Sequence, residues 1–249
     1  LRPDLKIVVM SATIDASDLA IKLDAPIIES KGRMFDVETG YVGDCDVMTI
    51  ASQVVETVRM AHAKHEGDIL AFLPGEAEIR QCAERLENTL GTTRVFPLYG
   101  MLPMSQQQEA IRYVEGRRKV VLATSIAETS LTIEGVKIVV DSGYCKAMKY
   151  DPNTGLSRLE IERVSLDMAD QRRGRAGRLS SGFCYRMWTP GTEMRMKAHR
   201  SPEIEQADLS QLVLDLALWG ETNPENLLWL TPPPAASVLR AKELLFMLD

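Results

Sequence analysis

The chain has 249 residues, of which 45% are hydrophobic and 26% are charged. This composition excludes a disordered, collagen-like or disulfide-scaffold protein, and the length allows one or two domains. The net charge of −6 argues against a protein that holds nucleic acid with a uniformly basic surface. No apolar run approaches the ~18 residues of a membrane span, so no contact with a membrane is expected.

Short β-branched runs alternate with helical patterns from the start of the chain, which predicts an α/β fold with a parallel sheet. The predicted strands are residues 6–10, 68–73, 94–99, 119–124, 137–141 and 183–188, and the predicted helices between them are 48–64, 76–90 and 105–114. Residues 146–164 break the alternation, because turn-forming residues at 151–155 separate two strand-like arms. This pattern predicts a β-hairpin.

The last fifty residues show no strong strand pattern. Leu209, Leu212, Val213 and Leu216 form a helical stripe, and a final helix is predicted at 235–248 after three consecutive prolines. Residues 168–200 contain eight Lys or Arg against two Asp or Glu, whereas 201–249 contain two against eight. This reversal of charge predicts a domain boundary near residue 201.

Cysteine and histidine spacing indicates no metal site. The four cysteines match no metal or redox spacing, so we expect reduced core thiols and a cytoplasmic location. His62 and His65 could share a metal from one helix face, but no third ligand is near in sequence, which favours a solvated face. The chain begins with Leu1 rather than Met and shows no secretion signal, and we expect a piece of a longer protein.

The strongest motif is QRRGRAGR at 171–178. On a helix, Gln171, Arg175 and Arg178 would share one face, while Arg172 and Arg173 would point elsewhere. Planar guanidinium groups suit phosphate oxygens and can neutralise charge in phosphoryl transfer. The two glycines weaken a helix, so a close backbone approach should explain them. The alternative is a solvated basic helix, which is disfavoured because too few acids accompany the motif.

Small hydroxyl residues follow a buried strand in KVVLATSIAETSLTIE, residues 119–134. Ligands gather at the carboxyl ends of parallel strands, where hydroxyls and backbone amides suit phosphates. Ser11, Ala12 and Thr13 follow the strand at 6–10 in the same way, although a helix cap explains them equally well. Taken alone, FLPG at 72–75 is a strand followed by a turn.

Together, the segments KIVVMSAT, ILAFLPGEAEI, PLYGMLPMSQQQ, VVLATSIAETSLTIEGV, YDPNTGLSRL and QRRGRAGR resemble the DEAH/RHA branch of the superfamily 2 helicases. The closing segments HRSPEIEQADLSQLVLDLALWG and LTPPPAASVLRAKELL resemble its bacterial HrpB-type members. The resemblance implies an α/β fold with a RecA-like parallel sheet, flanking helices and an inserted hairpin, followed by a winged-helix-like region. The implied domains are the end of a first RecA-like domain at 1–34, a second at 35–200, and the start of an accessory domain at 201–249.

The resemblance also implies a function, the second half of the motor of an ATP-dependent helicase. Such a motor moves 3′ to 5′ along single-stranded nucleic acid, here RNA in preference to DNA, and needs ATP and Mg²⁺. The implied coupling residues are Ser11, Ala12 and Thr13, and the implied nucleic-acid contacts are Gly75, Thr124, Ser125 and Ser130. The implied nucleotide contacts are Thr132, Glu134, Gln171, Arg175 and Arg178, with Gln171 and two arginine fingers, Arg175 and Arg178, as catalytic residues. The hairpin would separate bases.

Two positions depart from the family pattern, Ser125 where Asn is usual and Glu134 where Asp is usual. The chain has neither a GxxxxGK[ST] phosphate loop nor a DExH tetrad, so ATP and Mg²⁺ would require the rest of the polypeptide. That absence leaves open a scaffold or nucleic-acid-binding protein that has lost the motor. A dinucleotide oxidoreductase is excluded, because no GxGxxG follows the first strand.

Overall fold

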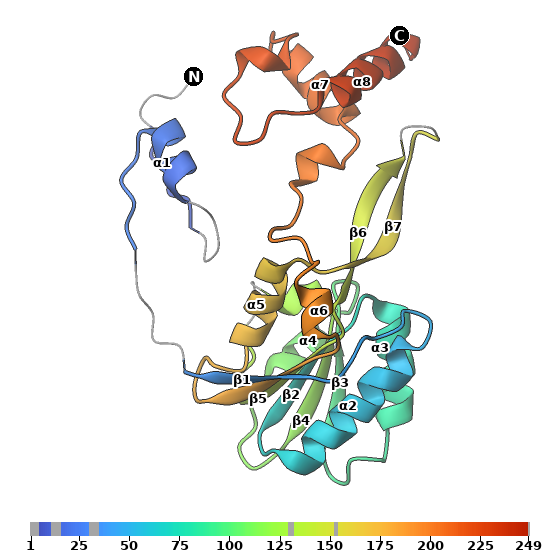
Figure 1. Cartoon of the computed structure of the whole chain (residues 1–249). Helices are drawn as coiled ribbons and strands as arrows, with labels where there is room; N and C mark the ends of the chain where they lie inside the picture. Colours follow the sequence, from blue (N-terminus) through green and yellow to red (C-terminus); the bar gives the residue numbers. More distant parts are fainter. Residues whose placement is uncertain (1–4, 11–15, 30–34, 129–131, 152–153, 249) are drawn as a thin grey trace. The chain divides into compact units, whose positions relative to one another are not determined.

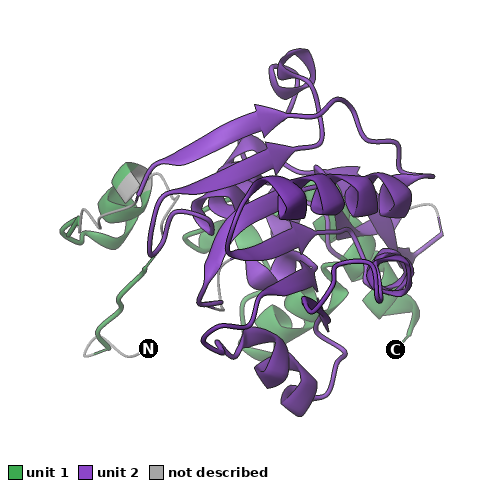
Figure 2. Ribbon diagram, turned by 90° about the horizontal axis from the view of Figure 1, so that it is seen from below, with its two compact units in different colours: residues 1–31, 208–249 green, residues 32–207 purple. Residues whose placement is uncertain are grey.

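A computed structural model describes residues 5–10, 16–29, 35–128, 132–151 and 154–248. The chain divides into two compact units, one made of residues 32–207 and the other of 1–31 together with 208–249 (Figure 2). Across the described residues, no helix is both long and apolar enough to cross a membrane.

The unit of residues 32–207 is built on a sheet of six parallel strands (Figure 1). Their order across the sheet is β1 (Val37–Tyr41), β8 (Gly182–Arg186), β5 (Val136–Asp141), β2 (Asp68–Phe72), β4 (Lys119–Ala123) and β3 (Arg94–Leu98). The strands predicted from residue 68 onward are confirmed to within two residues. Strand β1, VETGY, was missed because it lies at an edge of the sheet and carries polar residues.

Helices cover both faces of this sheet because its buried strands alternate their side chains between two cores. Ile69 and Ala71 of β2 pack with helices α2 (Ile50–Lys64) and α3 (Glu76–Leu86). Leu70 and Phe72 face the opposite side and pack with helix α4 (Met104–Ile111). The remaining helical segments of this unit are η1 (Ser125–Ala127), α5 (Leu166–Gly174), α6 (Pro190–Glu193) and η2 (Glu203–Glu205).

Two predicted helices end earlier than expected. Helix α3 stops at Leu86 rather than residue 90, and Asn88 adopts a left-handed backbone with φ of 60° in the turn that follows. Helix α4 stops at Ile111 rather than residue 114. The Lys119 ammonium donates to the carbonyl oxygens of Ala110, Ile111 and Arg112 at 2.8, 3.1 and 2.8 Å and so satisfies its last carbonyl groups. A cap supplied from a neighbouring strand leaves no signal in the local sequence.

The predicted hairpin is confirmed as the antiparallel strands β6 (Tyr144–Asp151) and β7 (Leu156–Arg163), which extend away from the sheet (Figure 1). Met148, Leu156 and Leu159 are 53%, 58% and 62% exposed. The hairpin therefore presents apolar side chains to solvent rather than packing them on the sheet. Gly155 closes the described part of the turn with a left-handed φ of 68°.

In the other unit, the described helices are α1 (Ala16–Leu23), η3 (Pro224–Asn226), α7 (Ser210–Leu218) and α8 (Ala235–Met247). Helices α7 and α8 confirm the two predicted helical segments. The strand predicted at 6–10 is wrong, because residues 5–10 form no strand and are exposed. A strand needs a hydrogen-bonded neighbour, and none of the described strands pairs with this segment.

Candidate nucleotide and nucleic-acid site

The hydroxyl residues after β4 lie at the carboxyl edge of the sheet, beside the turn after β2. The Leu73 amide donates to the Ala123 carbonyl at 2.9 Å, and the Thr124 amide donates to the Leu98 carbonyl at 3.2 Å, so the chains continue side by side past the strand ends. Thr124 and Ser125 are half-buried there. This is the edge at which α/β sheets bind their ligands.

Gly75 is the N-cap of helix α3 on the same edge and lies close to the hairpin. A Cβ atom there would collide with the ammonium group of Lys146 on the hairpin, which forms an ion pair with Glu78 at 3.6 Å. The backbone of Gly75 is extended, with φ of −160°, and the clashing group is the end of a flexible side chain, so neither conformation nor space requires glycine here. Gly75 therefore lies where the hairpin meets the sheet.

The basic motif lies partly on helix α5, which ends at Gly174. Gln171 is in the helix and is half-buried, Arg175 is the C-cap, and Arg178 follows a turn. The predicted single helical face across 171–178 is therefore wrong in detail. The helix ends three residues before Gly177, which passes close to β1 and to the chain that precedes it. A turn, not a helix, brings the two arginines to the same loop.

The structure brings together Thr132, Arg175 and Arg178. Arg178 Nη1 donates to Thr132 Oγ1 at 3.0 Å, and Arg175 donates to the Glu128 carbonyl oxygen. Both contacts reach the segment that follows β4, so the motif and that segment form one site. Arg178, Thr132 and Glu134 are exposed, so a ligand can reach all three, and Arg178 is the cation that would attract an anion.

Arg175 is buried, with 5% of its surface exposed. Burial, and secondarily the nearby charge of Arg178, lower the pKa of Arg175 to about 10. A guanidinium with this pKa stays charged at neutral pH. It is nevertheless poorly solvated, so an incoming anion would gain more from it than from an exposed arginine.

Arg172 carries a buried ion network that sequence reasoning missed. It is fully buried, and its Nε and Nη1 donate to Glu128 Oε1 and Asp141 Oδ1, both at 2.7 Å. Burial alone would disfavour the charged guanidinium, but the carboxylates of Asp141 and Glu128 raise its pKa. The ring of Phe72 lies 4.8 Å from the guanidinium carbon. Arg172 thus fastens α5 to the end of β5 and to Glu128, the residue that follows η1.

Four predicted functional residues lie outside the described residues: Ser11, Ala12, Thr13 and Ser130. Elsewhere, in the described part of the chain, no cluster of His, Cys, Asp and Glu could hold a metal. His62 and His65 are not simply solvated, because their rings bond to Thr93 Oγ1 at 2.9 Å and to the Tyr185 hydroxyl at 2.5 Å. The four cysteines are buried free thiols, as predicted.

Comparison with known proteins decides the family. Residues 49–180 match the model of the helicase conserved C-terminal domain, which is more than half of the chain. The chain belongs to the DEAH/RHA branch of the superfamily 2 helicases. It is 42% identical, over its whole length, to the ATP-dependent RNA helicase HrpB of Escherichia coli (strain K12). Over 89% of its length it is 41% identical to the ATP-dependent RNA helicase DEAH11, chloroplastic, of Arabidopsis thaliana.

Solved structures of DEAH/RHA helicases share the fold. Two crystal structures of E. coli HrpB, one described as a DExH-box NTPase and the other as a DEAH/RHA helicase, match the whole chain with TM-scores of 0.91 and 0.94 at 42% identity. The chain spans about a third of those structures, 31% and 32%. It covers 31% of the HrpB sequence and 13% of DEAH11.

The close backbone approach predicted for the glycines of residues 171–178 is present at Gly177, and it can be tested by substitution. A Cβ atom on Gly177 would lie 2.6 Å from the Phe35 carbonyl oxygen and 2.7 Å from Val37 Cγ2. We expect Gly177→Ala to lower the free energy of unfolding by ~1–3 kcal/mol, because β1 and the preceding backbone must shift. Denaturant titration measures the change.

The matched control is Gly191→Ala in helix α6, where the nearest atom, Thr189 Oγ1, would lie 3.9 Å away. It should change the free energy of unfolding by no more than ~0.5 kcal/mol. Equal effects of the two substitutions would mean that the approach of Gly177 to β1 does not constrain the motif.

Proposed function

We propose that this chain is the second half of the motor of an ATP-dependent RNA helicase that moves 3′ to 5′ along single strands. Residues 35–200 are the second RecA-like domain in this proposal, 1–34 complete the first, and 201–249 begin a winged-helix domain. The convergence of Thr132, Arg175 and Arg178 beside the strand-end hydroxyls supports it most directly. Nucleotide and nucleic-acid contacts then share a single loop.

The proposed division of labour follows from charge and exposure. Arg175 and Arg178 neutralise charge on the transferring phosphoryl group, and Gln171, Thr132 and Glu134 hold the nucleotide. Bound ATP with Mg²⁺ supplies the phosphoryl group and its counter-ion. Both are cradled chiefly by the other RecA-like domain, because this chain has no phosphate loop.

On the nucleic-acid side, Gly75, Thr124, Ser125 and Ser130 contact the sugar-phosphate backbone, and Ser11, Ala12 and Thr13 couple hydrolysis to movement. Hydroxyls and backbone amides suit phosphate oxygens without reading bases. Ser125 in place of the usual Asn keeps a donor but shortens its reach. Glu134 in place of Asp lengthens its reach by one methylene.

The first test is ATP hydrolysis by this chain alone, for which we expect no turnover above background. The proposal requires the β/γ-phosphate cradle and the acid that holds Mg²⁺ to come from outside the chain. Phosphate release is measured with and without single-stranded RNA, in parallel with a longer protein carrying both halves of the motor. Turnover by the chain alone that disappears in Arg175→Ala would refute this division. A longer protein without RNA-stimulated hydrolysis would favour a scaffold.

The hairpin provides a second test, because its exposed apolar side chains suit a wedge between bases. In the longer protein, replacing residues 150–159 by a two-residue turn should leave ATP hydrolysis on single strands largely intact. Duplex unwinding should fall sharply, because parting stacked pairs costs a few kcal/mol and needs an obstacle at the junction. A parallel decline of both activities, with an unchanged melting temperature, would make the hairpin a coupling element instead.

A finer variant isolates the apolar contact. Leu156→Ser/Leu159→Ser removes two side chains that are 58% and 62% exposed, so the fold should be unaffected. Met101→Ser is the control, because Met101 is 86% exposed and lies outside the hairpin. Only the hairpin variant should slow unwinding.

A further inference from the structure

A cavity of about 310 Å³ lies at the base of the hairpin, within the unit of residues 32–207. It is bounded by β6, β7, the start of α5 and the segment 195–201. Five cationic side chains line it: Lys149, Arg163, Arg195, Lys197 and Arg200. None of them belongs to the proposed nucleotide or nucleic-acid contacts.

The cavity is locally basic in a chain whose net charge is −6. Its lining contains one carboxylate, Glu162, which lies 3.2 Å from the Lys149 ammonium. Behind the lining, Asp167 is engaged by Ser165 Oγ and by the Met168 amide at 2.8 Å. It also lies 3.5 Å from His199 Nδ1, at the rim. The nearby acids are therefore committed to other partners.

Three of the cations form no ion pair with a carboxylate among the described residues. Arg195 makes a 3.4 Å hydrogen bond to Thr192 Oγ1, and Lys197 makes one of 3.4 Å to Ser201 Oγ. Arg200 donates only its backbone amide, to Asp167 Oδ2 at 3.4 Å. All three side chains are exposed. Long contacts to neutral hydroxyls leave their positive charge available to an anion.

Backbone hydrogen bonds fix the shape of the cavity. The Leu166 and Asp167 amides donate to the carbonyl oxygens of Lys197 and Ala198 at 2.9 and 3.1 Å, which fastens the basic segment to the start of α5. Met168 and Met196 are 5% and 9% exposed and pack together beneath the opening. Because these helix amides already have partners, the attraction for an anion comes from the side chains.

We infer that this cavity binds a backbone phosphate of single-stranded nucleic acid at the foot of the hairpin. The inference rests on the proposed function, because the hairpin rises from the rim of the cavity and a strand that meets it passes close by. Arg195 and Arg200 offer planar forks that fit phosphate oxygens, and Lys197 adds a point charge. Such a site anchors the strand without reading its sequence.

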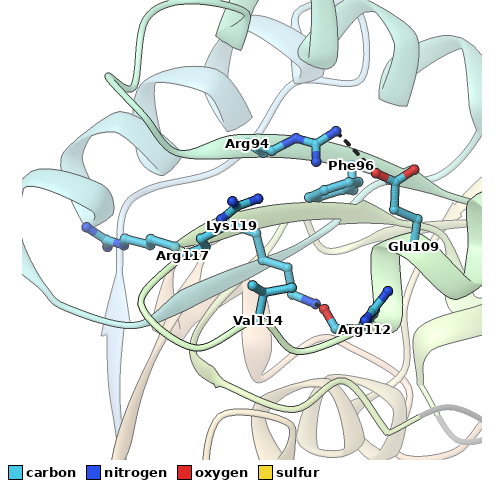
Figure 3. Close-up of a pocket in the computed structure, with 8 residues that line it drawn as sticks. Arg94, Phe96, Glu109, Arg112, Val114, Arg117 and Lys119 are labelled. Atoms are coloured by element: carbon cyan, nitrogen blue, oxygen red, sulfur yellow. Dashed lines mark hydrogen bonds and ion pairs between the residues drawn. The ribbon is translucent and has the colours of Figure 1, made fainter.

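The test is binding of a fluorescein-labelled oligouridylate to the 249-residue chain, followed by anisotropy over a range of salt concentrations. Lys197→Gln/Arg200→Gln removes two charges from the cavity. Arg112→Gln/Arg117→Gln is the control and removes two charges that are also exposed, from another basic cavity of about 190 Å³. Figure 3 shows that second cavity, which lies at the amino ends of β3 and β4, the sheet edge opposite to Thr124.

The cavity variant should weaken binding about tenfold or more at low salt, because it removes two phosphate contacts. It should also lower the slope of log Kd against log salt by ~1.4, since each contact on a single strand contributes ~0.7. The control should shift Kd by less than ~2-fold, as expected for charges outside the contact. Melting curves verify that both variants fold.

Other outcomes overturn the inference in distinguishable ways. Equal losses in both variants would indicate diffuse attraction, and an unchanged cavity variant would remove the site while leaving the proposed function intact. No binding by the unaltered chain would count against the proposed function itself. If a poly-glutamate peptide displaces the oligonucleotide equally well, the cavity accepts any acidic chain. If millimolar inorganic phosphate empties it, the ligand is free phosphate.

A second measurement needs no substitution. In the unaltered chain with ¹³C-methyl methionine, oligouridylate should shift the Met196 signal, because that side chain lines the cavity, and should leave Met60 on α2 unchanged. An unmoved Met196 signal at saturating oligonucleotide would exclude the site.

Discussion

Arg175→Ala should lower the rate of ATP hydrolysis by the complete motor by ~10³ to 10⁵, whereas the affinity for single-stranded RNA should change little. The reason is that an arginine finger acts on charge that develops in the transition state. Arg175 reaches the loop after β4 rather than the strand-end hydroxyls themselves. The measurement is kcat at saturating ATP and RNA, alongside Kd for RNA without nucleotide.

Two further variants separate this role from a structural one. Arg175→Lys keeps the charge but loses the planar fork, so it should remain severely impaired if bidentate geometry matters. Arg173→Ala alters the same motif at a side chain that is 42% exposed and pairs with Asp170 at 3.6 Å, and it should hydrolyse ATP nearly normally. Equal losses of RNA affinity and turnover in Arg175→Ala would place Arg175 on the nucleic-acid face.

The second large effect concerns stability. Arg172→Met should lower the free energy of unfolding by ~3–5 kcal/mol, because it leaves two buried carboxylates, Glu128 and Asp141, without their cation. Arg173→Met is the matched control and should cost no more than ~1 kcal/mol, since its ion pair is exposed. Denaturant unfolding at neutral pH measures both.

The decrease in the free energy of unfolding caused by Arg172→Met should become smaller as the pH falls. Burial already raises the pKa of Glu128, and removing Arg172 removes the charge that opposes this rise. A carboxyl whose folded pKa lies above its unfolded pKa stabilises the fold when protonated, and that contribution is lost as the pH rises through the folded pKa. The difference in the free energy of unfolding between variant and wild type should therefore be smaller at pH 5 than at pH 7. A difference that is larger at pH 5 than at pH 7 would contradict the role of Arg172 as the cation that neutralises Glu128 and Asp141.

The sequence predicted the interior strands because each is a buried apolar run, and such runs carry their own signal. It mispredicted residues 6–10 for the same reason, since an apolar run looks identical with or without a neighbouring strand. Strand β1, VETGY, gave no signal because it lacks an apolar run, whereas the other edge strand, β3, carries Val95 and Phe96 next to each other. At the site, the sequence predicted that Arg175 and Arg178 act together, because both belong to one short motif. The partners of Arg172 lie 44 and 31 residues away, at distances that local periodicity does not cover.

Glu128 has a mechanical consequence. Its carboxylate holds Arg172 and its backbone carbonyl holds Arg175, while it directly follows η1, which carries Ser125. Separating the loop after η1 from helix α5 would leave buried charges without partners, at a cost of several kcal/mol, far above thermal energy. Under the proposed function, Glu128 makes the loop and α5 move as one rigid body, so forces from a bound strand and from a bound phosphate would act on the same body.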